Sequence, residues 1–159
     1  MSRTLDLHPS AAPQTLTSLS STAQKVGASF HAFTPHCPGS GAEISEVIAY
    51  CFDISGNCQR LAEEISEADR EVRRNWEHYH SEIKRTVGSI GWTFGDVHTI
   101  LGEGLLDAEE EGVGREKAYR RIWREINEGV GVESGNRLVR RLKYYVGMMK
   151  ELVWVVREG

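Results

Sequence analysis

Apolar and aromatic side chains recur at intervals of three and four residues between positions 61 and 90. They are Leu61, Ile65, Ala68, Val72, Trp76, Tyr79, Ile83, Val87 and Ile90. This spacing places all of them on one side of an α-helix, which at about 1.5 Å per residue would be about 45 Å long. Charged residues such as Glu63, Arg70 and Glu77 occupy the other side. We therefore predict one long amphipathic helix whose apolar stripe must be covered by partner helices.

A second amphipathic segment precedes it over residues 41–54. Ser40 and Glu43 have the spacing of a capping box, in which two side chains bond the first free backbone N–H groups of a helix. Apolar residues then follow at helical spacing, at Ile44, Val47, Ile48, Cys51 and Ile54. We expect this helix to stop near Gly56, because glycine costs about 1 kcal/mol inside a helix. Continuity with the long stripe stays open.

Glycines at positions 88, 91 and 95 indicate that the long helix ends near Ile90. An apolar cluster then predicts a short helix over residues 94–101. Residues 102–114 are acidic and rich in glycine, which is typical of an exposed loop.

Two further helices are predicted in the last third of the chain. Residues 115–128 carry an apolar stripe that ends before Gly129, a residue suited to the position after a helix. Residues 135–157 carry a longer stripe, and Ser134 is placed to cap its beginning.

The first 39 residues are rich in Ser, Thr, Ala and Pro and poor in large apolar side chains. Such a segment buries too little surface to offset the entropy lost on ordering. We therefore predict that residues 1–39 form a flexible, disordered tail. Val26, Phe30 and Phe33 are apolar enough to dock on the rest of the protein as a short extra segment.

These elements predict an all-α fold, an antiparallel bundle of four or five helices over residues 40–159, because short connections favour antiparallel neighbours. The length of 159 residues fits one domain. The predicted core consists of Ile44, Val47, Ile48, Leu61, Ile65, Val72, Trp76, Ile83, Trp123, Leu138, Leu142, Tyr145, Met149 and Leu152.

Charge is distributed unevenly along the chain. The net charge is only −4, which gives no general case for nucleic-acid binding. Residues 91–114 contain six acids and no Lys or Arg, whereas residues 115–159 contain eleven bases and six acids, a net charge of +5. We interpret these as an acidic loop beside helices with solvated basic faces. The alternative is a basic surface for phospholipid headgroups or an acidic partner.

Three cysteines, Cys37, Cys51 and Cys58, cannot all pair with one another. A reducing compartment such as the cytoplasm therefore fits better than secretion. Cys51 and Cys58 would share one face of a continuous helix and pack there as small apolar groups. We expect neither a transmembrane helix nor a signal peptide. A mitochondrial presequence stays open, although Pro9 and Pro13 argue against the amphipathic helix that it would need.

Two groups of residues have metal-ligand chemistry but lack the full pattern. Glu77 and His80 have the Glu-x-x-His spacing of di-iron bundles, which needs two such pairs, and the chain contains one. His31, His36 and Cys37 lack the second spaced pair of a zinc site. We expect no metal, no cofactor, no small-molecule substrate and no enzymatic activity.

The beginning of the last helix is basic. Arg137, Arg140, Arg141 and Lys143 precede Tyr144, with Met148 and Trp154 further along. The favoured interpretation is a core helix with solvated bases, because the helical spacing accounts for every apolar residue. The other is that Arg137, Arg140, Arg141, Lys143 and Tyr144 contact a partner protein or an anionic membrane surface.

The segments at residues 119–123 (Tyr-Arg-Arg-Ile-Trp) and 136–145 (Asn-Arg-Leu-Val-Arg-Arg-Leu-Lys-Tyr-Tyr) resemble a family of helical domains. These are the N-terminal domains of filamentous-fungal NLR-like proteins that carry NACHT or ankyrin regions. The resemblance covers residues 42–157. It implies a non-enzymatic domain for self-association or signalling, with membrane-directed cell-death activity in some relatives.

We therefore expect a helical module for protein–protein interaction or oligomerisation, in fungal signalling or self/non-self recognition. The alternative function is a membrane-active bundle that acts through its basic amphipathic last helix.

Overall fold

The computed structural model describes residues 5–129 and 137–159, and every regular element in these ranges is a helix. The elements are α1 (Ala12–Phe30), the 3-10 helix η1 (His31–His36), α2 (Gly41–Ser66), α3 (Arg70–His78), α4 (His80–Glu110), α5 (Arg115–Gly129) and α6 (Leu138–Glu158). The all-α prediction is confirmed, although the described residues form six α-helices where four or five were expected.

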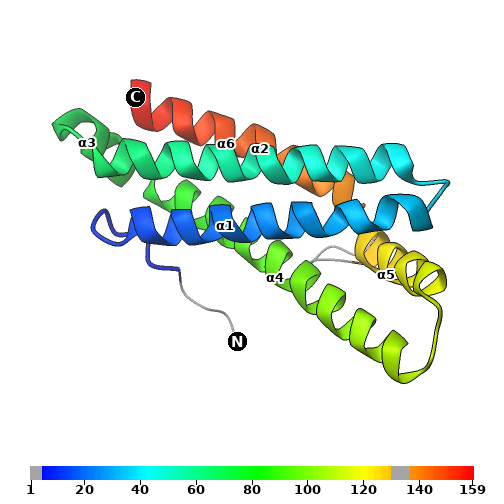
Figure 1. The fold of residues 1–159 in the computed structure, drawn as a ribbon. Helices are drawn as coiled ribbons and strands as arrows, with labels where there is room; N and C mark the ends of the chain where they lie inside the picture. Colours follow the sequence, from blue (N-terminus) through cyan, green and yellow to red (C-terminus); the bar gives the residue numbers. More distant parts are fainter. Residues whose placement is uncertain (1–4, 130–136) are drawn as a thin grey trace.

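Helices α1, α2 and α6 lie side by side, and α4 crosses obliquely beneath them (Figure 1). The expected antiparallel arrangement holds for α1 and α2. In contrast, α6 runs parallel to α2. Two ion pairs show this direction: Arg137 pairs with Glu43 where both helices begin, and Arg157 pairs with Glu64 where both end. This follows from α4, which carries the chain back to the end of the bundle where α2 begins.

The predicted disorder of residues 1–39 is wrong for the described part of that segment, from Leu5 onward. Helix α1 and η1 form there and belong to the same hydrophobic core as the other helices. Val26, Phe30 and Phe33 are buried, as the docking alternative expected. The boundary between a tail and a bundle at residue 39 is therefore not kept, and residues 1–4 lie outside the described ranges.

Small residues explain how a helix so poor in large side chains holds its place. The Ser20 hydroxyl lies 2.7 Å from the Ser55 hydroxyl and donates to the Ser55 carbonyl oxygen over 3.0 Å. A Cβ atom added to Gly27 would stand 2.9 Å from the Cβ of Cys51. The backbones of α1 and α2 therefore approach closely, and these short contacts add to the burial of Leu16, Leu19, Val26 and Phe30 in the core.

The single helix predicted over residues 61–90 is wrong, because the stripe is divided among α2, α3 and α4. Helix α2 does not stop at Gly56, whose missing side chain would face open space, and continues to Ser66. Asp69 then starts α3, where its carboxylate accepts from the backbone N–H of Val72 over 2.9 Å. This N-cap favours a new helix over continuation of the old one.

The break lets α3 fold across the end of the bundle, at the left of Figure 1. Its Trp76 side chain is fully buried, and the indole N–H donates to the carbonyl oxygen of Leu7 over 3.1 Å. Apolar spacing persisted through the turn because α3 still has to bury one side.

The short helix over residues 94–101 and the loop over residues 102–114 are also wrong, since α4 is continuous from His80 to Glu110. Its interior contains five glycines, and each costs about 1 kcal/mol relative to alanine. Burial of the opposite face offsets this cost, with Val87, Ile90, Phe94, Val97 and Leu101 in the core.

The two last helices agree with the sequence prediction. Helix α5 includes Gly129 as its final residue, and Ser134 lies outside the described ranges. The predicted capping box at Ser40 does not form: Ser40 is the N-cap residue, but its side chain makes no cap hydrogen bond. Glu43 instead accepts hydrogen bonds from Asn127 and Arg137. Of the fourteen predicted core residues, all are buried except Ile48 and Val72, which are half-buried against the core.

Candidate interaction surfaces on α4 and α6

The residues with metal-ligand chemistry have other surroundings in the fold. Glu77 is exposed on α3, while His80 belongs to α4. The imidazole ring of His36 stacks on Tyr119, with ring centroids 4.9 Å apart and planes 2° from parallel. Cys37 is buried. Within residues 5–129 and 137–159, no three His, Cys, Asp or Glu side chains are grouped as a metal site.

Cys51 and Cys58 are free and fully buried in α2, as expected of thiols that pack as small apolar groups. Burial raises the pKa of both thiols to about 12. They therefore stay protonated at neutral pH, and a protonated thiol is a poor nucleophile.

The structure separates the five surface residues predicted on the last helix. The Arg137 guanidinium is held by the Glu43 carboxylate at 2.7 Å, and Arg141 is half-buried. Arg140, Lys143 and Tyr144 project into solvent, with Tyr144 64% exposed. Arg140, Lys143 and Tyr144 are therefore open to solvent, Arg137 is ion-paired and Arg141 is half-buried, and the partner-binding role of these residues stays a prediction.

The apolar side of α6 is buried in the core through Leu142, Tyr145, Met149, Leu152 and Val156, among others. Its outward side carries a second aromatic residue, Trp154, which is 61% exposed. We call the exposed residues of this side the basic stripe: Arg140, Lys143, Tyr144, Lys150, Glu151 and Trp154. No described carboxylate forms an ion pair with Arg140, Lys143 or Lys150.

A stripe of opposite charge runs along α4. Its residues lie four and three positions apart, which places them on one side of the helix. We call them the acidic stripe: Trp92, Asp96, Thr99, Glu103, Leu106 and Glu110. Trp92 is 48% exposed and Leu106 is 58% exposed. This surface was not predicted, because glycines at positions 88, 91 and 95 indicated the end of a helix. The helical spacing from Trp92 to Glu110 is the signal in the sequence that could have revealed it.

A groove of about 990 Å³ separates α1 from the first half of the acidic stripe. Ser18 and Thr22 line it from α1, and Gly88, Gly95 and Trp92 line it from α4. A Cβ atom added to Gly88 or Gly95 would have no neighbour within 4 Å. The two helices therefore leave room between them that small side chains do not fill.

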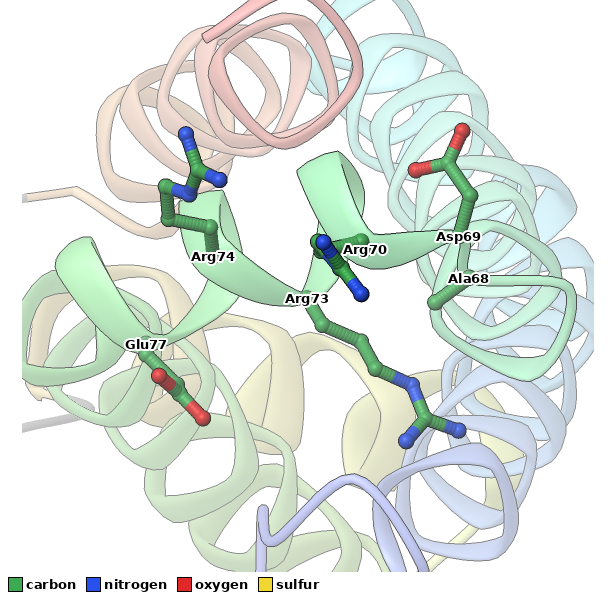
Figure 2. A pocket seen from close by; sticks show the side chains of 6 residues that line it. All are labelled: Ala68, Asp69, Arg70, Arg73, Arg74 and Glu77. Atoms are coloured by element: carbon green, nitrogen blue, oxygen red, sulfur yellow. The ribbon is translucent and has the colours of Figure 1, made fainter.

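Three arginines on the exposed side of α3, Arg70, Arg73 and Arg74, line a hollow of about 540 Å³. Figure 2 shows that their guanidinium groups point in different directions. Asp69 and Glu77 line the same hollow and reduce its positive charge. The arginines do not converge on one position, so we interpret them as solvated surface charges.

The described helices do not include one with the length and apolarity that crossing a bilayer requires. Comparison of the chain with protein-family models, with curated proteins and with solved structures finds no match.

Proposed function

We propose that this protein is a non-enzymatic module that binds other polypeptides by helix packing. The observation that carries the proposal is the exposure of four large apolar residues on two ordered stripes, Trp92 and Leu106 on α4, and Tyr144 and Trp154 on α6. Trp and Tyr are the residues that most often dominate the binding energy of an interface. Large apolar groups aligned on a surface mark interaction sites more often than single scattered ones do.

The groove between α1 and α4 supports the same proposal. Partner helices commonly bind by inserting apolar anchors into a groove between two helices. Here Trp92 stands at the groove, and Gly88 and Gly95 leave its floor open to a partner side chain. Three of the lining side chains from α1, those of Thr15, Ser18 and Thr22, are short, which lets a partner approach the backbone closely there.

The membrane-active alternative has less support. A helix that lies on a membrane inserts its apolar face, and the apolar face of α6 is buried against the other helices. Of the large apolar residues described in α6, only Tyr144 and Trp154 are exposed and could make such a contact. Flotation with anionic liposomes separates the two functions, and we expect the folded protein to stay unbound.

We further propose a cytoplasmic role in fungal signalling or self/non-self recognition, which rests on the family resemblance. Three free thiols, all buried, suit a reducing compartment.

Site-specific photo-crosslinking in cells that make the protein tests the proposal. We would replace Trp92 or Trp154 by benzoylphenylalanine, and use exposed Gln24 on α1 and Lys117 on α5 as control positions. We expect discrete adducts at positions 92 and 154 and none above background at positions 24 and 117. Equal labelling at all four positions, or none at either stripe, would refute the proposal.

A further inference from the structure

We infer that the partner is a second copy of this chain, whose basic stripe on α6 packs against the acidic stripe on α4 of the first copy. This inference rests on the proposed function and names the polypeptide that is bound.

The two stripes have complementary charges although the whole chain has a net charge of only −4. The acidic stripe carries three carboxylates, at Asp96, Glu103 and Glu110, and no base. The basic stripe carries three cations and one acid, Glu151. Opposite charges steer two surfaces together and set their register. A copy of this chain therefore offers the charge pattern that its own α4 surface requires.

Each stripe also carries two large apolar residues. Trp92 and Leu106 are 14 residues apart, or about 21 Å along a helix, and Tyr144 and Trp154 are 10 residues apart, or about 15 Å. Both distances are shorter than the helices that carry them, so a contact between the two helices along their length can include all four residues. The open groove beside Trp92 has room for an aromatic ring from the partner's α6.

The contact cannot form within one copy. The hydrogen bonds described between α6 and α4 involve the first half of α4, where the Tyr145 hydroxyl lies 2.8 Å from that of Thr93 and 3.4 Å from the Ser89 carbonyl oxygen. Beyond this point α4 diverges, so that its second half lies on the opposite side of the molecule from α6 (Figure 1). Because the stripes are different surfaces, the contact either repeats from copy to copy or closes into a reciprocal pair.

Charge reversal combined with sedimentation velocity tests this inference. One variant reverses the acidic stripe (Glu103→Lys with Glu110→Lys), and the other reverses the basic stripe (Lys143→Glu with Lys150→Glu). We expect the unmodified chain to self-associate, more weakly at high salt. Each variant alone should weaken self-association by about tenfold or more, because two attractions become repulsions. An equimolar mixture of the two variants should associate again.

Helix α5 offers matched controls with the same changes in charge. Glu125→Lys with Glu128→Lys, and Lys117→Glu with Arg124→Glu, alter exposed positions away from both stripes and should leave association unchanged. Circular dichroism checks that every variant is folded.

Self-association that ignores both reversals, or a mixture that stays dissociated, would overturn the inference. A strict monomer that still forms adducts with a different protein at position 92 or 154 would reject the second copy and leave the proposed function standing. A strict monomer without such adducts would reject both.

Discussion

Small residues line α1 on both of the sides that face a neighbouring long helix. Toward α2, Ser20 and Gly27 meet Ser55 and Cys51 at contact distance. Toward α4, Ser18 and Thr22 face glycines across an open groove. The same kind of residue thus forms a closed seam on one side and an unfilled space on the other.

This difference separates glycines whose presence is explained by packing within the chain from glycines whose presence is not. In the closed seam, a larger residue at Gly27 would collide with Cys51, so packing within the chain accounts for the glycine. At Gly88 and Gly95 no described neighbour would be touched by a side chain. Each of these glycines costs stability inside a helix without allowing a contact in return, as expected of positions reserved for a partner.

The largest expected effect concerns the exclusion of water from the two buried thiols of α2. Cys51 and Cys58 have a pKa of about 12 in the folded protein, above the ordinary value of 9.0. Between pH 9 and pH 12 the unfolded chain releases these protons first, so the free energy of unfolding falls as pH rises. The loss should be about 1.4 kcal/mol per pH unit for each thiol. Denaturant unfolding below and above pH 9 measures it.

The Cys51→Ala variant is the control for this pH dependence. Its free energy of unfolding should fall less steeply above pH 9 than that of the unmodified chain. Equal slopes would mean that water reaches the thiols.

The next effect compares leucine at a glycine of each surface. Gly27→Leu should cost at least about 2 kcal/mol, because the new side chain overlaps Cys51. Gly95→Leu should not destabilise the protein, because its side chain enters open space. Urea unfolding of both variants measures the difference. Equal losses of stability would show that the groove is closed in solution.

A smaller effect is expected at the hydroxyl pair of the seam. Ser20→Ala should cost about 1–2 kcal/mol, because it leaves the buried Ser55 hydroxyl without its partner. Ser20→Ala combined with Ser55→Ala should cost less than the sum of the two single changes. A double-mutant cycle by thermal unfolding measures the coupling; strict additivity would argue against a direct hydrogen bond.

The smallest effect has the opposite sign. Gly88→Ala and Gly95→Ala should each stabilise the protein by about 0.5–1 kcal/mol, since alanine favours a helix and restricts the unfolded chain. The same changes should weaken self-association, because they narrow the groove. Calorimetry and sedimentation velocity measure the two effects, and stabilisation without weaker association would separate the groove from the interface.

Sequence periodicity predicted those helices whose contacts use large side chains. Helices α5 and α6 and most of the core, including Trp76, Leu142 and Met149, belong to this class. Helix α1 was missed because its few large core residues, Leu16, Leu19, Val26 and Phe30, lie among many Ser, Thr and Ala residues, a composition typical of disorder. The division of the long stripe into three helices was not predicted, because the apolar residues of α3 keep helical spacing after the Asp69 cap.

The candidate surfaces show the same pattern. Arg140, Lys143 and Tyr144 were predicted because they stand on a helix that the sequence revealed. The acidic stripe was not, because glycines at positions 88, 91 and 95 indicated the end of a helix and residues 102–114 were predicted as a loop. Their tolerance depends on burial of the opposite side of α4, which is a tertiary effect.

The parallel contact between α2 and α6 also bears on how the protein is synthesised. Helix α6 leaves the ribosome after every other described helix, yet it covers the side of α2 that α1 leaves bare. Until α6 is made, the α1–α2 hairpin therefore exposes apolar surface to solvent. Nascent chains in this state bind chaperones or aggregate. A chain released before Leu138 has been translated would keep this apolar surface exposed.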